Sequence, residues 1–146
     1  MPVIVVGADT PIGTRLVEHF GGRDREIRAF VTDPEAGLAL RRDGIKVAVG
    51  DVTDDSHVTG ACLNCFSAVL VMEAARDDRL RSFARGFDAV LDSWAAAVRT
   101  ANVRRVIWVG DAVPPPVPDV EVAMVSPRHP DVVGEVFRLD DSATLD

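Results

Sequence analysis

Short runs of consecutive apolar residues alternate with amphipathic stretches along most of the chain. Unbroken apolar runs are typical of strands that are buried on both faces of a parallel sheet, and apolar positions three or four residues apart predict helices. The pattern predicts six strands, at residues 3–6, 27–31, 45–49, 68–72, 103–109 and 120–125, and a short edge strand at 135–139. Helices are predicted at residues 14–20, 34–42, 54–63 and 78–101.

Strands that alternate with helices predict a single three-layer α/β domain built on a doubly wound parallel sheet. Residues 1–112 are expected to form the core of this domain. Residues 113–146 are expected to add a proline-rich connector, the final strand or strands and an acidic tail. In this architecture ligands bind at the carboxyl ends of the strands.

The turn between the first strand and the first helix is the strongest candidate for a binding site. Gly7 permits a tight turn, and Gly13 permits close packing of the helix against the strand. Backbone amides at the start of such a helix, together with the helix dipole, favour a diphosphate group. The spacing therefore indicates a nucleotide-binding turn.

Residues 2–112 resemble the atypical and extended short-chain dehydrogenase/reductases, which include NmrA-like and NAD-dependent epimerase/dehydratase proteins. The segment Gly7–Gly13 is similar to the family's Gly-Ala-Thr-Gly-x-Ile-Gly pattern. The resemblance continues through Val31–Pro34, Gly50–Asp54 and Val103–Val109. It implies a Rossmann-like domain that binds NAD or NADP.

The resemblance also implies which residues contact the cofactor. The residues expected at the diphosphate are Gly7, Thr10, Ile12 and Gly13. Those expected at the adenine are Asp51 and Val52, and those expected along the ribose are Val71 and Met72.

The choice between NAD and NADP stays open. Relatives that select NADP often carry Arg where Thr32 stands, so the cation that would hold a 2′-phosphate is missing. Asp33 is able to accept a ribose hydroxyl, which would favour NAD. The alternative is that Asp33 is a turn residue before Pro34.

Three residues of the glycine-rich turn depart from the family pattern. Asp9 brings a negative charge, Thr10 replaces the middle glycine, and Pro11 removes one amide donor. Thr10 and Pro11 also form a good helix start by themselves. Two interpretations follow: the turn binds a dinucleotide, or the side chains of Asp9 and Thr10 cap the helix and occupy the anion site.

The residues for reductase chemistry are missing. By the resemblance, reducing enzymes use a Tyr-x-x-x-Lys pair, but this chain has no Tyr and its one Lys is Lys46. The family's serine after the fifth strand aligns with Gly110 or Asp111. Asp111 is therefore a candidate general acid or base, or else a solvated carboxylate at a strand end. Residues 119–146 are too few for the family's substrate domain, which is expected to be absent.

Acidic residues are concentrated at the end of the chain. Residues 1–110 hold 14 Lys and Arg and 15 Asp and Glu, whereas residues 111–146 hold 2 and 8. A nearly neutral body with an acidic end does not match a polyphosphate backbone, so no nucleic-acid partner is expected. No apolar run approaches the length of a membrane span, and residues 1–3 do not begin a signal peptide. We therefore expect no membrane association and a cytoplasmic location.

Cys62 and Cys65 form an isolated Cys-x-x-Cys pair. A structural zinc site needs four ligands, and the sequence has neither a second pair nor a cluster of histidines. No metal site is expected, and the two residues are interpreted as semi-buried structural thiols.

The helix predicted at 78–101 has an apolar stripe and a second face of small residues. The small residues are Gly86, Ala89, Ser93, Ala96 and Ala97. They form either solvated surface or a face for close packing in a homodimer, and the homodimer is the prediction.

Three functions are compatible with the sequence. The first is a stand-alone NAD(P)-binding domain without Tyr–Lys reductase activity, used in redox sensing or as a subunit. The second is a degenerate interaction protein that has lost nucleotide binding and acts through its long helix or acidic tail. The third is an enzyme of altered chemistry that uses Asp111, and a cysteine of the pair, and is completed by a partner subunit.

Overall fold

The computed structural model describes residues 2–21, 26–76 and 86–145. Its six strands form one parallel sheet in the order β3-β2-β1-β4-β5-β6. They are β1 (Val3–Val6), β2 (Ile27–Val31), β3 (Lys46–Val49), β4 (Ser67–Val71), β5 (Arg105–Val109) and β6 (Glu121–Val125). The predicted doubly wound, Rossmann-like fold is confirmed, and the strand order reverses between β1 and β4, where such sheets bind ligands.

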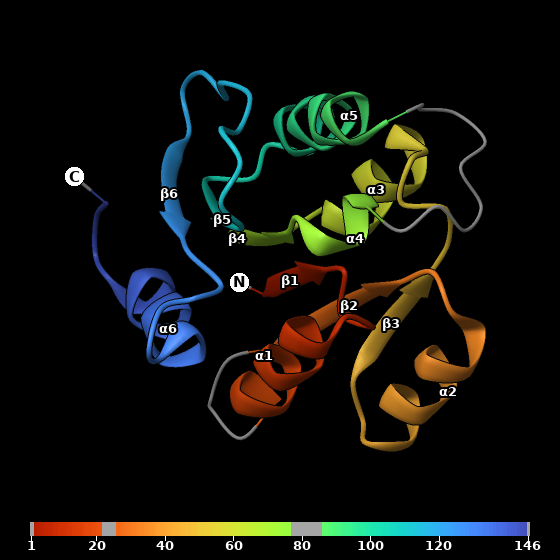
Figure 1. Ribbon diagram of the computed structural model, residues 1–146. Coiled ribbons are helices and arrows are strands. Elements are labelled where there is room, and N and C mark those ends of the chain that lie inside the picture. Colours follow the sequence, from red (N-terminus) through yellow and green to blue (C-terminus); the bar gives the residue numbers. More distant parts are fainter. Residues whose placement is uncertain (1, 22–25, 77–85, 146) are drawn as a thin grey trace.

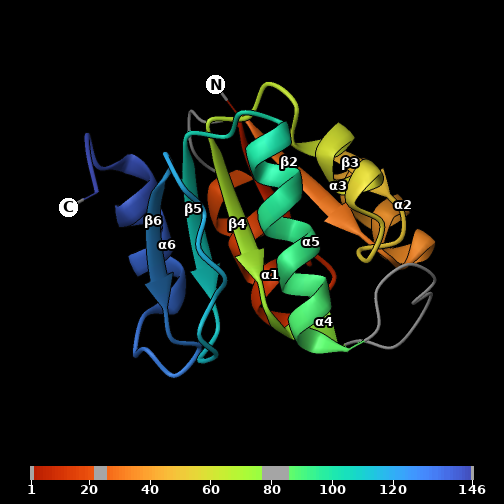
Figure 2. The same cartoon turned by 90° about the horizontal axis from the view of Figure 1, so that it is seen from above.

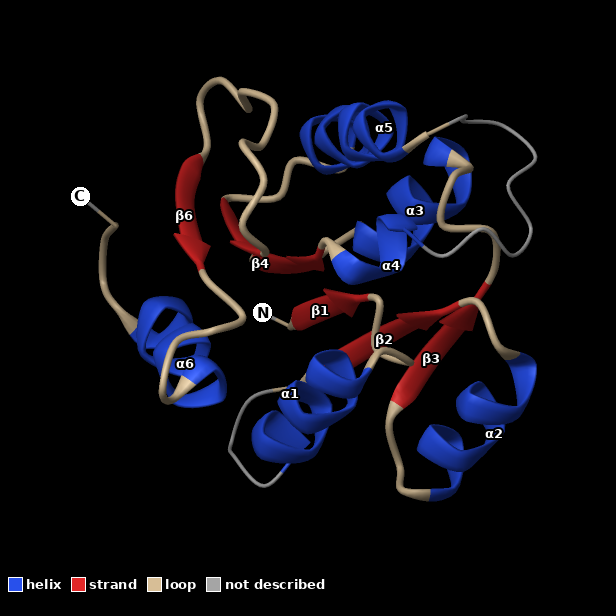
Figure 3. Cartoon of the chain, viewed as in Figure 1, coloured by secondary structure: helices blue, strands red, loops and turns tan. Residues whose placement is uncertain are grey.

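Helices cover both faces of the sheet (Figures 1 and 3). They are α1 (Pro11–Gly21), α2 (Pro34–Arg42), α3 (Asp55–Cys62), α4 (Glu73–Arg76), α5 (Phe87–Thr100) and α6 (Val132–Asp141). One face packs against α1, α2 and α6, and the other packs against α3 and α5. None of the described helices is long and apolar enough to cross a membrane.

Strand β1 shows how both faces of the sheet are buried. Val3 and Val5 belong to the core beneath α1 and α6, whereas Ile4 and Val6 belong to the core beneath α3 and α5. All four side chains are at most 1% exposed. An unbroken apolar strand therefore lies in the middle of the sheet, with its carboxyl end directed to the glycine-rich turn.

The edge strand predicted at 135–139 is wrong, because this segment belongs to helix α6. Asp131 caps the helix through a hydrogen bond from the Gly134 amide to its Oδ1 (3.1 Å). The buried positions Val132, Val133 and Val136 are spaced for one helical face. The apolar residues within 135–139 therefore belong to an amphipathic helix.

A single helix through residues 78–101 is also wrong at Gly86. This residue has φ of 83° and precedes α5 as its N-cap, so helical geometry is broken there. Residues 78–85, including the stripe positions Leu80 and Phe83, lie outside the described residues.

The amino edge of the sheet holds a buried guanidinium. Arg105, the first residue of β5, is 0% exposed. Its Nη1 donates to the carbonyls of Leu139 (2.9 Å), Asp140 (2.8 Å) and Ser142 (2.6 Å). Its Nη2 donates to Glu121 Oε2 (2.9 Å) and to the carbonyl of Ala143 (3.2 Å). Arg105 thus fastens the carboxyl end of α6 to the sheet, where the helix dipole favours a cation.

Candidate functional site

The glycine-rich turn leads from β1 into α1 at the carboxyl edge of the sheet. Gly7 has φ of 89°, and the amides of Gly7 and Ala8 both donate to the carbonyl of Phe30 in β2 (3.1 Å each). A Cβ on Gly13 would lie 2.0 Å from the Gly7 carbonyl oxygen, and a Cβ on Gly7 would lie 2.8 Å from Ala74 Cβ. Neither position has room for a side chain, because neighbouring atoms of the protein come too close. The predictions that Gly13 allows close packing of helix and strand and that Gly7 allows a tight turn agree with this geometry.

Thr10 caps helix α1, as the second interpretation of the turn expected. Its hydroxyl donates to the Gly7 carbonyl (2.6 Å) and accepts from the Gly13 amide (3.0 Å). Pro11 carries no N–H. Within the described part of the chain, no group accepts from the amide of Ile12. The first turn of α1 therefore offers an anion one amide donor, at Ile12, unless Thr10 gives up the Gly13 amide.

Asp9 does not cap helix α1, so that part of the interpretation is wrong. Its Oδ2 accepts instead from the backbone amides of Thr32 (3.0 Å) and Asp33 (3.1 Å), which follow β2. Because β1 and β2 are neighbours, a side chain that leaves the end of β1 reaches the end of β2 directly. Asp9 thus ties the glycine-rich turn to the β2–α2 loop.

The two candidates after β2 have structural roles of their own. Asp33 is the N-cap of α2, and its Oδ1 accepts from the Glu35 amide (3.1 Å). Thr32 is 6% exposed. The turn-residue alternative for Asp33 is therefore confirmed, and a contact of Thr32 or Asp33 with a ribose stays a prediction.

Asp51 and Val52 shape the loop that follows β3. Asp51 Oδ1 accepts from the amide (2.8 Å) and the hydroxyl (2.7 Å) of Thr53. The carbonyl of Val52 accepts from the Trp94 indole N–H (2.7 Å), and the Val52 side chain is buried. These bonds fix the loop against α5, and the predicted adenine contact of this pair is not tested by them.

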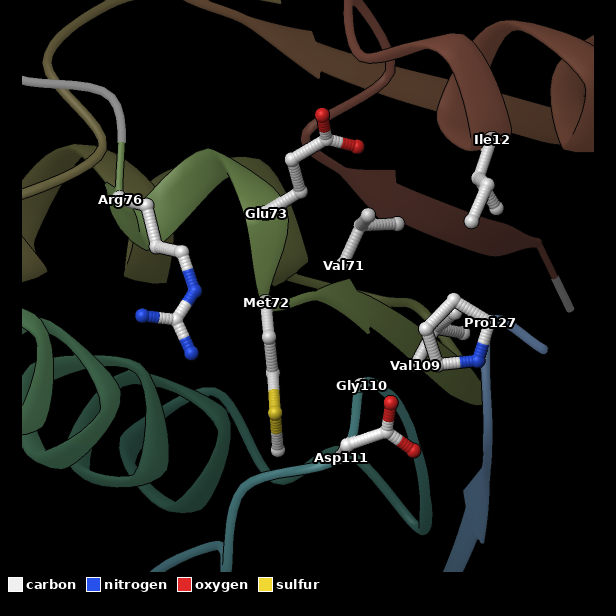
Figure 4. A pocket seen from close by; sticks show the side chains of 9 residues that line it. All are labelled: Ile12, Val71, Met72, Glu73, Arg76, Val109, Gly110, Asp111 and Pro127. Carbon is white, nitrogen blue, oxygen red and sulfur yellow. The ribbon is translucent and has the colours of Figure 1, made fainter.

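A pocket of about 240 Å³ opens at the carboxyl ends of β4 and β5, beside the start of α1 (Figure 4). Its lining includes four residues singled out from the sequence, namely Ile12, Val71, Met72 and Asp111. Gly110, the other position that aligns with the family's serine, also lines it. The lining residues that sequence reasoning missed are Glu73, Arg76, Val109 and Pro127. Glu73 and Arg76 belong to the one-turn helix α4, whose position directly after β4 was the signal available for them. Figure 2 shows this helix at the edge to which the arrowheads of β4, β5 and β6 point.

Met72 and Gly110 form one wall of this pocket. The Met72 side chain extends from the end of β4 toward Gly110 and Asp111 (Figure 4). A Cβ on Gly110 would lie 2.2 Å from Met72 Sδ and 2.7 Å from Met72 Cβ. The glycine at 110, where the family's serine aligns, is therefore packed against Met72 without room for a side chain.

Charged groups of both signs surround the apolar floor. Asp111 Oδ1 accepts from the Ser126 hydroxyl (2.7 Å), and Arg128 Nε lies 3.5 Å from Asp111 Oδ2. The Arg76 guanidinium stacks on the Phe87 ring, 4.0 Å from its centroid. Asp111 keeps 47% of its side chain exposed, so it is both solvated and directed at the pocket (Figure 4).

The remaining reactive side chains lie elsewhere. Lys46 begins β3 at the amino edge of the sheet, where Nζ is 2.5 Å from Glu26 Oε1. Cys62 and Cys65 are buried free thiols, and burial raises the pKa of Cys62 to about 12. Both cysteines are buried, as the structural interpretation expected, and neither of them lines the pocket. No group of three potential ligands for a metal ion occurs among the described residues.

Comparison with known proteins identifies the family. A family profile described as NAD(P)H-binding matches residues 7–127. The chain belongs to this NAD(P)H-binding family. The resemblance to atypical short-chain dehydrogenase/reductases is thereby confirmed, and no curated protein matches the chain.

Several solved structures share the fold. Citrobacter sp. triphenylmethane reductase complexed with NADP(H) is 20% identical with a TM-score of 0.64, over 77% of this chain and 38% of that chain. Escherichia coli NADPH-dependent quinone oxidoreductase complexed with NADPH is 20% identical with a TM-score of 0.60, over 74% and 36%. A Pseudomonas aeruginosa nucleoside-diphosphate-sugar epimerase is 15% identical with a TM-score of 0.60, over 77% and 34%. The chain thus corresponds to little more than a third of each of these proteins.

Proposed function

We propose that this NAD(P)-binding domain holds its dinucleotide along the carboxyl edge of the sheet without Tyr–Lys reductase chemistry, and serves as a redox sensor or as a subunit. The observation that carries the proposal is that the candidate binding site and the one lysine lie at opposite edges of the sheet. The glycine-rich turn and the pocket lie at the carboxyl edge, whereas the one Lys lies at the amino edge and the chain has no Tyr.

The cofactor site fits a dinucleotide in shape. Gly7 and Gly13 let the turn pack closely enough against β4 and α1 to form this edge, and the Ile12 amide lies in the first turn of α1 beside the pocket. We assign Gly7, Thr10, Ile12 and Gly13 to the diphosphate, with the Thr10 hydroxyl bound to the turn itself and not to a phosphate. The other proposed contacts are Thr32, Asp33, Asp51 and Val52 on the adenosine side, and Val71 and Met72 along the ribose that faces the pocket. A bound NAD or NADP would supply hydride-transfer chemistry, and these residues would bind and orient it.

Thermal unfolding with NAD, NADH, NADP and NADPH tests the proposal. A ligand at about 100 times its Kd stabilises the folded state by about 2.7 kcal/mol and raises the Tm by several degrees. We expect such a shift with at least one dinucleotide, and no turnover of NADH or NADPH with quinone acceptors. No shift with any of the four would overturn the proposal. Steady turnover would overturn the absence of reductase activity.

The cap on α1 favours a second candidate function. Because Thr10 already holds the Gly13 amide, the turn is stable without an anion, as an interaction protein that has lost nucleotide binding would require. The absence of any thermal shift would support this candidate.

Asp111 supports the third candidate, an enzyme of altered chemistry completed by a partner. Its carboxylate lines the pocket and is held by Ser126. If Asp111 transfers protons, D111N abolishes any turnover found with the partner. Unchanged turnover in that variant would contradict this role.

A homodimer through residues 78–101 also stays a proposal. Ala97 is buried in the core of its own chain, whereas Ala96 is exposed beside Asp92 on the outer side of α5. Light scattering measures the mass directly: twice 15.7 kDa in the wild type and 15.7 kDa in A96R would support the dimer. A monomeric wild type at tens of micromolar would contradict it.

A further inference from the structure

The carboxylate of Asp9 occupies the backbone amides at the carboxyl end of β2. Both the Thr32 amide (3.0 Å) and the Asp33 amide (3.1 Å) donate to the same oxygen, Oδ2. Thr32 is 6% exposed, and Asp9 is half-buried, so the contact is shielded from solvent on one side. The carboxylate is therefore fixed in position by the main chain of a neighbouring loop.

The end of β2 is where a dinucleotide-binding domain distinguishes its two cofactors. In this architecture an acidic side chain about 20 residues beyond the glycine-rich turn accepts the 2′-hydroxyl of the adenosine ribose, and a cation there accommodates a 2′-phosphate. The residue at that place in this chain is Asp33, whose Oδ1 caps α2 through the Glu35 amide. A second acidic group at the end of β2 is Asp9, which reaches it from the glycine-rich turn.

We propose that Asp9 makes this site selective for NAD over NADP, an inference that rests on the proposed dinucleotide-binding function. A 2′-phosphate would meet a carboxylate of like charge, and the two amides that would otherwise donate to it are already taken. A 2′-hydroxyl is neutral and donates a hydrogen bond to a carboxylate. The selectivity therefore comes from Asp9, at the position where the family's Gly-Ala-Thr-Gly-x-Ile-Gly pattern has threonine.

The geometry provides a variant that removes the charge and is able to keep both amide bonds. Because one oxygen of Asp9 accepts both amides, the carbonyl oxygen of asparagine is able to accept both of them in D9N. The β2–α2 loop is then expected to keep its place, which the Tm and the circular dichroism spectrum of D9N will show. E35Q is the matched control, because it removes one negative charge from the first turn of α2, where Glu35 is exposed.

Calorimetric titration of the full chain with NAD and with NADP measures the selectivity. For the wild type we expect NAD to bind about tenfold tighter than NADP or more. In D9N the Kd for NADP is expected to fall about tenfold, with a change in the Kd for NAD of less than about threefold. E35Q is expected to keep the wild-type ratio of the two constants.

The possible failures are distinct. Equal affinities in the wild type, or an unchanged ratio in D9N with a native Tm, would overturn the role of Asp9 and leave dinucleotide binding intact. A shift of the ratio in D33N but not in D9N would assign selectivity to Asp33 and overturn the role of Asp9 as well. Absence of binding by either dinucleotide would overturn the proposed function together with this inference.

Discussion

The two edges of the sheet use charged side chains in opposite ways. At the amino edge, the guanidinium of Arg105 is fully enclosed and makes five hydrogen bonds to the last turn of α6, the segment after it and Glu121. At the carboxyl edge, Asp111 and Arg76 stand in partial contact with solvent around an apolar pocket. The first arrangement satisfies a cation with the chain's own carbonyls, whereas the second leaves charges directed at a space that a ligand can enter.

The comparison indicates where stability and binding are located. A buried guanidinium whose Nη atoms donate to carbonyls and a carboxylate contributes to folding only when these partners are all present. A half-exposed carboxylate beside a pocket contributes little to folding and is available to a ligand. Replacing a charged side chain at the amino edge should therefore alter stability, whereas replacing a charged side chain at the pocket should alter binding.

Replacement of Arg105 by methionine is expected to have the largest effect. It leaves the carbonyls at the end of α6 and the Glu121 carboxylate without their donor, so the free energy of unfolding should fall by about 3 kcal/mol in chemical denaturation. R104M is the matched control, because Arg104 is exposed beside it, and should change stability by less than about 0.5 kcal/mol. Similar stabilities of the two variants would show that the amino edge does not depend on the guanidinium.

Replacement of Gly13 by alanine breaks the turn at the other edge. The added Cβ would lie 2.0 Å from the Gly7 carbonyl oxygen, so we expect a loss of about 2 kcal/mol and loss of dinucleotide binding. In G60A, where nothing lies within 4 Å of the new Cβ, alanine should instead stabilise helix α3 by about 0.5–1 kcal/mol. Denaturation curves of both variants, with a binding titration of each, measure this. If G13A is as stable as the wild type, the proposed steric conflict between a Cβ at position 13 and the Gly7 carbonyl is wrong.

The role of Gly13 could be predicted from the sequence, whereas the role of Arg105 could not. The strands and the need for glycine at positions 7 and 13 follow from local pattern, because an apolar strand, a tight turn and a helix start are all short-range features. The carbonyls that accept from Arg105 lie 34–38 residues away along the chain, and the amides bound by Asp9 lie 23 and 24 residues away. Such contacts depend on which strands become neighbours, so no local pattern predicts them.

The pocket likewise contains some residues that the sequence predicted and others that it did not. Ile12, Val71 and Met72 were predicted as site residues by the family resemblance. Asp111 was predicted because it aligns with the family's serine, and all four residues line the pocket. Pro127 was missed, since its place at the pocket depends on how the loop after β6 folds back over β5. Part of helix α6 was misassigned as a strand because the five residues 135–139 are too short a window to distinguish the helical period from the strand period.

Removal of the Thr10 cap should strengthen binding at the carboxyl edge. In T10G the Gly13 amide is released for a phosphate, so dinucleotide affinity should rise about fivefold in calorimetric titration, while stability falls by a few tenths of a kcal/mol. Thr14 donates to the Ala8 carbonyl (2.9 Å) but holds no amide, so T14A should leave the affinity near the wild-type value. Weaker binding in T10G would mean that the threonine hydroxyl itself contacts the ligand.

The smallest expected effect is a pH dependence at the amino edge. The Leu145 amide and the Arg105 guanidinium hold the pKa of Glu121 below its ordinary value of 4.5. Because the folded-state pKa is lowered, the stabilisation is present above the ordinary value and is lost as the pH falls through the folded-state pKa. The difference in unfolding free energy between the wild type and E121Q should therefore disappear in acid. A constant difference from pH 7 to pH 2 would contradict this origin.

Amide chemical-shift mapping of the isotopically labelled chain with NAD and NADP tests the central claim most directly. The account predicts that the shifts of a bound dinucleotide cluster at the carboxyl edge, in residues 7–13, 32–33, 51–53, 71–73 and 110–111, with the Ile12 amide among the most affected. Amides around Arg105 and the end of α6 should stay unchanged. Shifts confined to the amino edge, or the absence of shifts at millimolar dinucleotide, would contradict it.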